Sequence, residues 1–217
     1  MTMRTVATRI ATLTTTIAAA VTLSAVLAGC GSSTSSTGST APPASNSAKA
    51  APVAQAHNQA DITFATDMIE HHTQAVSMSK LAAEHASSPQ VKDLAARIEA
   101  AQQPEIDQMR GFLRAWNAPV PDTNDSGMSG MNHGDMSENN MPGMMSGQQM
   151  QQLDQASGAA FDTMFLRMMI GHHQGAVTMS KTELAEGENP DAKALAQNII
   201  DAQQREITAM QTLLARG

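Results

Sequence analysis

The sequence predicts an all-α protein, a four-helix bundle made of two copies of one helical hairpin, and three observations lead to this prediction. The first is an internal repeat with a constant offset of 101 residues, which aligns residues 61–114 with residues 162–215. The second is the helical spacing of apolar residues in both copies. The third is that neither copy shows the period-two alternation of a half-buried strand.

A histidine pair lies at the centre of the repeat. The first copy reads FATDMIEHHTQAVSMSK over residues 64–80, and the second reads FLRMMIGHHQGAVTMSK over residues 165–181. A repeated hairpin that cannot bury its apolar face alone does so by packing against its neighbour. The two copies are therefore expected to form one domain over residues 57–217.

The N-terminal residues are expected to lie outside this domain. Residues 1–29 combine Arg4 and Arg9 with a long apolar run of small residues, which is typical of a secretory signal peptide. The following Leu-Ala-Gly-Cys30 resembles the lipobox of bacterial lipoproteins, and this resemblance implies cleavage before Cys30 and its lipidation. An ordinary signal peptide or a short membrane anchor is the alternative. Residues 30–56 are rich in Ser, Thr, Ala and Pro, which predicts a flexible tether.

The first hairpin is expected over residues 57–116. Its first helix should run from about His57 to Ala86, because apolar residues recur there at helical spacing. Ser88 is a candidate N-cap and Pro89 a favourable first helical residue, so a second helix should begin there and end near Trp116.

The second hairpin is expected over residues 153–217. Its first helix should run from about Leu153 to Glu186, and Asn189 with Pro190 should cap and open the last helix. A long link over residues 117–152 joins the hairpins. Two tight hairpins with one long connection match the single crossover of ferritin-like bundles, although an up-down bundle remains an alternative.

Composition and charge exclude several classes of protein. The formal charge is −7, and it becomes −9 without Arg4 and Arg9, which argues against nucleic-acid binding. Cys30 is the only cysteine, so an intrachain disulfide and cysteine-based zinc or iron–sulfur sites are excluded. Tyrosine is absent, whereas methionine occurs 17 times.

Helical geometry places the histidine pairs at the edge of the core. His71 and Met78 should lie side by side on the first helix, and antiparallel packing could bring them towards Glu105 and Met109. The second copy repeats the pattern, and the candidate metal ligands in it are His172, His173, Met179, Glu206 and Met210. His72 is a further candidate ligand. Imidazole, thioether and carboxylate groups would then converge between the helices. Alternatively, the histidines are hydrogen-bonded core residues and the methionines fill the core.

The link carries methionines that a flexible connector does not need. They alternate with Gly, Ser and Asn, and the candidate ligands there are Met128, Met131, His133, Met136, Met141, Met144 and Met145. Thioethers select soft ions, chiefly Cu(I) or Ag(I), and they replace easily oxidised thiols in an oxidising compartment. A segment that docks a partner or scavenges oxidants is the alternative.

The run Met-Asn-His-Gly-Asp-Met resembles the methionine-rich segments of periplasmic copper-resistance proteins. The duplicated His-His…Met unit, with the following Gln…Glu-Ile…Met helix, resembles the bacterial family "domain of unknown function 305". That resemblance implies a ferritin-like four-helix bundle in exported proteins, some of which bind copper. It carries over to His71, His72, Met78, His172, His173 and Met179. Di-iron chemistry does not carry over, because neither pair has the required Glu-x-x-His unit.

The sequence thus favours a non-enzymatic, lipid-anchored protein of the bacterial periplasm or cell envelope. It would bind Cu(I), or Ag(I), for sequestration, tolerance or transfer to partner proteins, and its membrane contact would be through lipidated Cys30. A ferritin-like, metal-dependent redox enzyme is one alternative. A structural or partner-binding envelope lipoprotein is the other.

Overall fold

The computed structural model describes residues 56–122 and 141–216. The predicted signal peptide, Cys30 and nearly all of the tether lie outside these ranges, as do Met128, Met131, His133 and Met136. The described residues form five helices, which are α1 (Gln59–His85), α2 (Pro89–Ala115), α3 (Gly147–Gln155), α4 (Gly158–Glu186) and α5 (Pro190–Leu214). The predicted all-α class is confirmed.

The helices of both hairpins begin at residues that cap them. Ser88 accepts a hydrogen bond from the backbone of Val91 at the start of α2, and Asn189 accepts from Asp191 and Ala192 at the start of α5. Proline follows each cap at the first helical position, where its missing N–H costs nothing. Both predicted helix starts are confirmed.

The third predicted helix is divided in the structure. Instead of one helix from about Leu153, α3 ends at Gln155 and α4 begins at Gly158. Ser157 is extended and Gly158 has a φ of +62°, a conformation that favours glycine and breaks the helical path. Ser146 and Gln149 form a capping box that starts α3 inside the predicted link.

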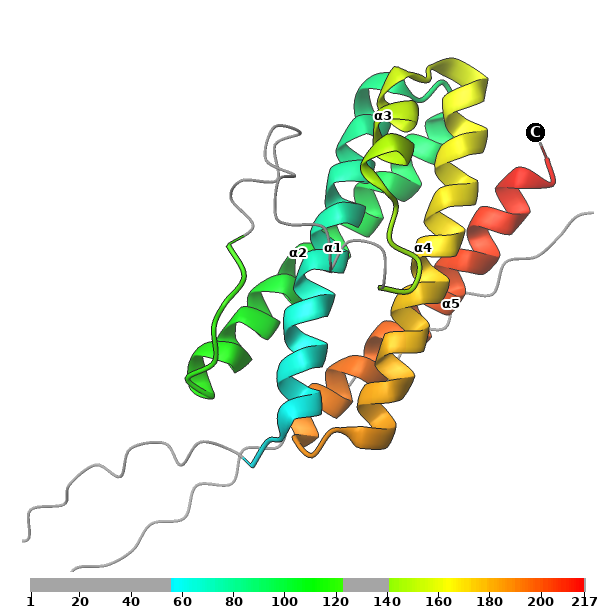
Figure 1. Ribbon diagram of the computed structural model, residues 1–217. Helices are drawn as coiled ribbons and strands as arrows, with labels where there is room; N and C mark the ends of the chain where they lie inside the picture. Colours follow the sequence, from blue (N-terminus) through cyan, green and yellow to red (C-terminus); the bar gives the residue numbers. More distant parts are fainter. Residues whose placement is uncertain (1–55, 123–140, 217) are drawn as a thin grey trace, which may run out of the picture. The chain divides into compact units, whose positions relative to one another are not determined.

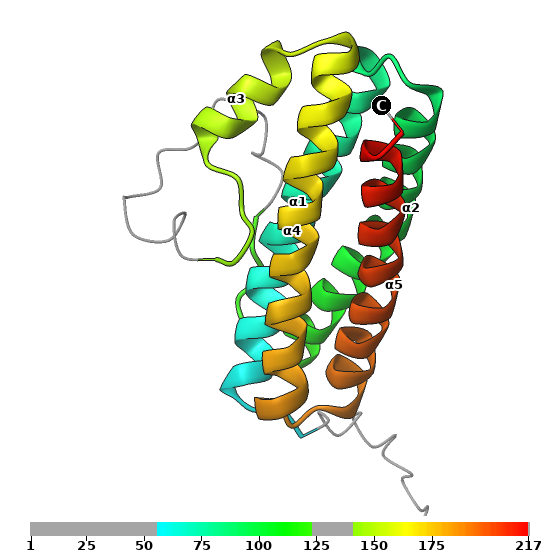
Figure 2. The ribbon, with the colours of Figure 1, turned by 90° about the vertical axis from the view of Figure 1, so that its right-hand side faces the viewer.

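Helices α1 and α2 pack as one hairpin, and α4 and α5 pack as the other. The hairpins meet mainly through α1 and α4, which run antiparallel (Figure 1). Because each hairpin is itself antiparallel, α2 and α4 run in the same direction (Figure 1). Figure 2 shows α3 and the end of the link on the outer side of α1 and α4, opposite α2 and α5. This is the expected single-crossover connectivity.

Each hairpin caps the turn of the other through equivalent aspartates. The carboxylate of Asp61 on α1 accepts hydrogen bonds from the backbone N–H groups of Glu188 (3.1 Å) and Asn189 (2.9 Å). Asp162 on α4 accepts from the N–H groups of Ser87 (3.1 Å) and Ser88 (2.9 Å). The residues on both sides differ by the repeat offset of 101, so the two copies are related by an approximate two-fold axis.

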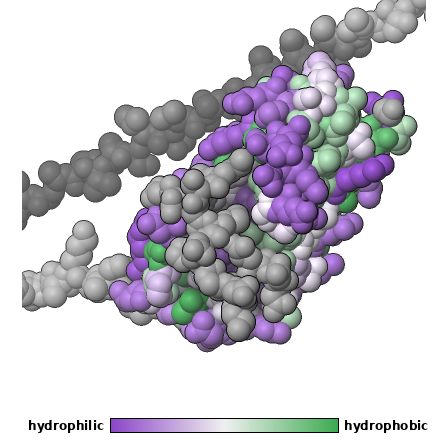
Figure 3. Space-filling view, turned by 45° about the horizontal axis from the view of Figure 1, so that its top comes forward, coloured by the Kyte–Doolittle hydropathy of each residue, from purple (hydrophilic) through white to green (hydrophobic). Residues whose placement is uncertain are grey.

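Two apolar clusters fill the bundle, and polar residues separate them along every long helix. Around α1, Phe64, Met68 and Ile69 belong to the first cluster, whereas Met78 and Ala82 belong to the second. The histidine pair falls between them. Figure 3 shows hydrophilic residues with hydrophobic residues among them on one face of the described chain. No helix in residues 56–122 or 141–216 has the length and apolar character of a membrane span.

Candidate metal site

The four histidines of the repeat lie together in the centre of the bundle. His71, His72, His172 and His173 have 0% exposed surface. We call these four residues, with Glu105 and Glu206, the central polar layer. Burying so many polar side chains is unfavourable unless hydrogen bonds or a ligand compensate for the loss of water.

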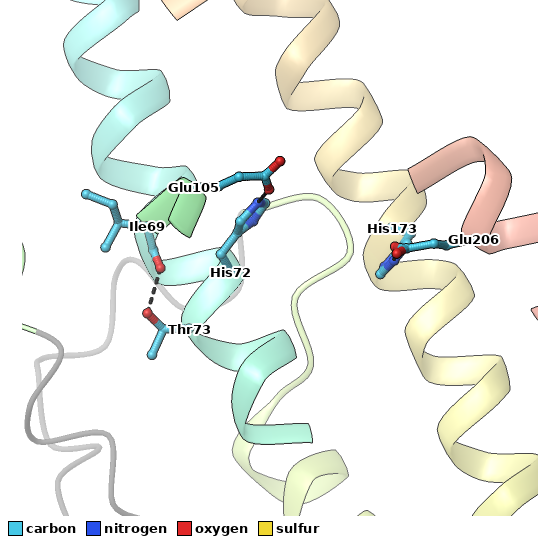
Figure 4. Close-up of polar contacts among 6 residues, drawn as sticks. All are labelled: Ile69, His72, Thr73, Glu105, His173 and Glu206. Carbon is cyan, nitrogen blue, oxygen red and sulfur yellow. Dashed lines mark hydrogen bonds and ion pairs between the residues drawn. The ribbon is translucent and has the colours of Figure 1, made fainter. Parts of the chain in front are cut away.

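One histidine of each pair is held by a carboxylate from the second helix of its own hairpin. The Nε2 atom of His72 lies 2.8 Å from Oε2 of Glu105, and that of His173 lies 2.7 Å from Oε2 of Glu206 (Figure 4). A carboxylate is an acceptor, so each imidazole donates from Nε2. This arrangement matches the outer-shell carboxylates that orient histidine ligands in metal proteins.

The other two histidines face each other between the hairpins. The ring centroids of His71 and His172 are 3.7 Å apart, with the planes tilted by 40°. His71 donates from Nε2 to the backbone carbonyl of Pro142, at 3.1 Å. Neither nitrogen of His172 has a hydrogen-bond partner among the described residues.

The same ring atom, Nδ1, lacks a hydrogen-bond partner in all four histidines. The Nδ1 atoms of His71, His72, His172 and His173 are buried, and none has a partner in the described part of the chain. A neutral ring that donates from Nε2 carries its lone pair on Nδ1, which is the form that binds metals. Buried nitrogens of this kind require an explanation.

Burial keeps the facing pair neutral. It lowers the pKa of His71 to about 3, and the neighbouring His72 adds to this effect. Burial is the main reason that the pKa of His172 lies well below its ordinary value, and repulsion from a protonated His71 lowers this pKa further. Both imidazoles are therefore free of an extra proton at neutral pH and can serve as ligands.

The structure separates the methionines that the sequence placed beside the histidines. Met78 packs in the second cluster with Met169 and Met210, whereas Met109 packs in the first cluster with Met68. The predicted approach of His71 and Met78 to Glu105 and Met109 is therefore not observed. His72, rather than His71, contacts Glu105. The hairpin is antiparallel as expected, and the difference lies in the rotation of α1 about its own axis, which turns His72 towards α2.

The end of the link forms a strap over the polar layer, and we define this strap as residues 141–146. The side-chain amide of Gln74 donates to the carbonyl of Met145 and accepts from its N–H, at 2.8 and 2.7 Å. Gly143, with a φ of +81°, packs closely on the α4 backbone. A Cβ atom on Gly175 would lie 1.8 Å from the carbonyl oxygen of Pro142. The strap therefore depends on these two glycines.

The strap carries three of the predicted link ligands. Met141, Met144 and Met145 are half-buried. Met179 is also half-buried, whereas its repeat equivalent Met78 is fully buried. Thioethers thus lie both in the core and on the strap side of α1 and α4.

Sequence reasoning did not select several buried polar groups near the layer. The side-chain amides of Gln102 and Gln203 and the hydroxyls of Ser79 and Ser180 have no hydrogen-bond partner among the described residues. Each pair is equivalent by the 101-residue offset. Their retention in both copies was visible in the sequence and is the signal that would have identified them.

The donor set limits the kinds of ion that fit. Within residues 56–122 and 141–216, no three His, Cys, Asp or Glu side chains converge as a metal-binding group. Hard ions need many oxygen ligands, and the two carboxylates of the layer already accept hydrogen bonds from His72 and His173. Soft ions that bind imidazole and thioether at low coordination number fit the unpartnered nitrogens of the facing pair better.

Comparisons with known proteins show the family of this chain. Residues 61–214 match the family described as Domain of unknown function (DUF305). A DUF305 protein from Streptomyces coelicolor, named as a candidate secreted protein, is 33% identical, and its structure aligns with a TM-score of 0.62 over 72% of this chain and 93% of that chain. A DUF305 fragment from Deinococcus radiodurans is 28% identical, with a TM-score of 0.64 over 74% and 98% of the two chains.

A third similar structure holds a metal ion. CopM in its Cu(I)-bound form is 29% identical, with a TM-score of 0.57 over 72% of this chain and 96% of that chain. CopM structures also exist in Cu(II)-bound, Ag-bound and apo forms. A search of curated proteins found no match.

Proposed function

The chain belongs to the DUF305 family, and from that premise we propose that it binds Cu(I), or Ag(I), as cargo through its central polar layer. The biological role would be copper sequestration, tolerance or transfer to partner proteins. The ion is held and released, and the proposal requires no turnover.

The observation that supports this proposal best is the set of four buried Nδ1 atoms without partners. Three of the four rings are fixed through Nε2 by Glu105, Glu206 or the Pro142 carbonyl. Fixing one nitrogen orients the other, and such outer contacts are typical of histidine ligands. A purely structural role would leave these lone pairs unused at a cost in free energy.

The facing pair is the most direct candidate for two of the ligands. His71 and His172 come from different hairpins, so an ion bound to one ring nitrogen of each would also bond the two copies together. Soft sulfur from nearby methionines could complete the coordination after small side-chain movements, because methionine is unbranched and adaptable. The metal-bound CopM structures support this assignment by similarity.

We propose that the protein acts outside the cytoplasm and is anchored through lipidated Cys30. The N-terminal pattern of residues 1–29 supports export. The similar Streptomyces coelicolor protein carries a secreted description, which agrees with this location. Methionine-based ligands also suit an oxidising compartment better than cysteine does.

A competition titration tests the proposal. The mature chain would be titrated with Cu(I) against a chromogenic chelator, beside a His71→Ala/His172→Ala variant and a variant with Met128, Met131 and Met136 changed to Leu. A His85→Ala variant is the matched control, since His85 lies outside the layer. We expect the first variant to lose affinity at least tenfold. Unchanged affinity in both the histidine and the methionine variants would disprove copper binding by these residues.

The redox-enzyme alternative has its own readout. Oxygen consumption or ferroxidase activity of the metal-loaded chain would favour it over storage or transfer. A purely structural role predicts that Cu(I) leaves the melting temperature unchanged, whereas an ion bound only to the folded state raises it.

A further inference from the structure

The outer groove between α1 and α4 has two halves related by the approximate two-fold axis of the repeat, and among residues 56–122 and 141–216 a helix covers only one half. α3 lies over the half formed by the end of α1 and the start of α4 (Figure 2). The other half, formed by the start of α1 and the end of α4, contains a cavity of about 500 Å³. Its lining includes Thr63, Asp67, Met179, Thr182, Glu183 and Glu186.

The 101-residue offset shows that these two halves are equivalent sites. Thr63 corresponds to Met164, and Thr182 corresponds to Leu81. On the side covered by α3, Leu81 and Met164 are partly buried and pack against the second apolar cluster. Met179 is half-buried in the cavity, whereas Met78 is fully buried on the covered side. The cavity is therefore the repeat equivalent of the surface that α3 covers.

The contacts of α3 show what this type of groove binds. α3 is nine residues long, and it buries one anchor, Leu153, with 0% exposed surface. The anchor packs in the cluster that contains Phe161 and Phe165. The next residue, Asp154, has its Oδ1 atom 3.8 Å from Nε2 of His85 on α1. The groove thus takes a short amphipathic helix through one apolar anchor and one polar rim contact.

The cavity half also has an apolar residue in its lining, but its rim is acidic. Phe64 lines the cavity where Phe165 lies on the covered side. Glu186 replaces His85, and Asp67 replaces Met168. Glu183, which replaces Ala82, is buried beside the carboxylate of Asp61. An occupant that matches this rim carries a basic residue where α3 carries Asp154.

We propose that this cavity docks a short amphipathic helix of a partner protein, with an apolar anchor followed by a lysine or arginine. The apolar part of the floor would receive the anchor, as the covered half receives Leu153. The basic residue would pair with Glu186 and Asp67 at the rim. The chain's net negative charge favours the approach of such a basic partner. This inference uses no histidine of the polar layer, although the strap residue Pro142 and the candidate ligand Met179 also line the cavity.

Peptides derived from α3 test the proposal. The probe is a ten-residue peptide with the sequence of residues 146–155 and lysine in place of Asp154, and the matched control is the same peptide with the native aspartate. Amide chemical shifts of the isotopically labelled mature chain would be followed during titration. We expect the lysine peptide to shift amides around Thr63, Met179 and Thr182, and to bind about fivefold more tightly than the aspartate peptide. An Asp67→Lys/Glu186→Lys variant should reverse this preference.

Several results would overturn the proposal. Equal binding of both peptides, or no shift at the cavity residues, would remove the role of the acidic rim. Shifts confined to Leu81 and His85 would mean that the peptide only displaces α3. Shifts of the same amides on dilution would identify a second copy of the chain as the occupant. If deleting residues 123–140 shifted the cavity amides without any peptide, the occupant of the cavity would be the chain's own link.

Discussion

The imidazole rings of His71 and His172 lie in contact across the boundary between the two hairpins, with 3.7 Å between their centroids. These residues are equivalent in the internal repeat, so they meet at the approximate two-fold axis. One hairpin alone supplies only half of this pair. The duplication therefore creates a pair of neutral, buried imidazoles that neither copy has by itself.

The carboxylates behind His72 and His173 should control metal affinity without touching the metal. Changing Glu105 and Glu206 to alanine removes the acceptors that orient these rings, so Cu(I) affinity should fall about 10- to 100-fold. Competition with a chromogenic Cu(I) chelator measures the change. Glu84→Ala, at an exposed position of α1, is the matched control and should leave affinity unaltered. Equal affinities for all three proteins would argue against this role for the carboxylates.

Two helical glycines should respond in opposite ways to alanine. Gly175→Ala places a Cβ atom against the Pro142 carbonyl and should detach the strap, because backbone leaves no room to adjust. Faster hydrogen exchange at the Met145 N–H, which donates to Gln74, would report this detachment. Gly171→Ala meets nothing within 4 Å and should stabilise the helix by up to about 1 kcal/mol. Unchanged exchange in Gly175→Ala would contradict the description of the strap.

Asp61 and Asp162, which each accept hydrogen bonds from the turn of the other hairpin, should contribute unequally to the free energy of unfolding. Asp61 is fully buried and accepts bonds from both Glu188 and Asn189, so Asp61→Ala should lower the free energy of unfolding by about 2–3 kcal/mol. Asp162 is half-buried, and Asp162→Ala should cost about 1–2 kcal/mol. Urea denaturation measures both values. A larger loss for Asp162→Ala would contradict this order.

Glu183 should make stability fall as pH rises. Burial, together with the nearby Asp61 carboxylate, raises the pKa of Glu183 from 4.5 to about 8. Between these two pH values the folded chain keeps a proton that the unfolded chain has released, so raising pH favours unfolding. Below about pH 4.5 the group makes no difference, and above about pH 8 its destabilising effect is complete.

The variant Glu183→Gln removes this titration while keeping the side-chain shape. It should match the wild type near pH 4.5 and exceed it in stability by a few kcal/mol at most above about pH 8. Denaturation across this range measures the difference between the two proteins. A constant difference at every pH would show that Glu183 does not titrate as described.

Local sequence determined the helical hairpins. Ser88 with Pro89, and Asn189 with Pro190, define helix starts through contacts within one turn, which a sequence reveals directly. The repeat offset determined that two equivalent copies exist. The separate α3 was not predicted, although the Ser146 capping box at its start is a local signal; its position depends on one leucine packed against other helices.

By itself, then, the sequence determined the all-α class, the duplication and the candidate ligand types, because these follow from periodicity, capping and residue chemistry. Only the tertiary structure decided that His72 pairs with Glu105, that His71 faces His172, and that Met78 and Met109 belong to different clusters. The rotation of each helix about its own axis sets these contacts. That rotation is the result of packing the whole core, and no single segment encodes it.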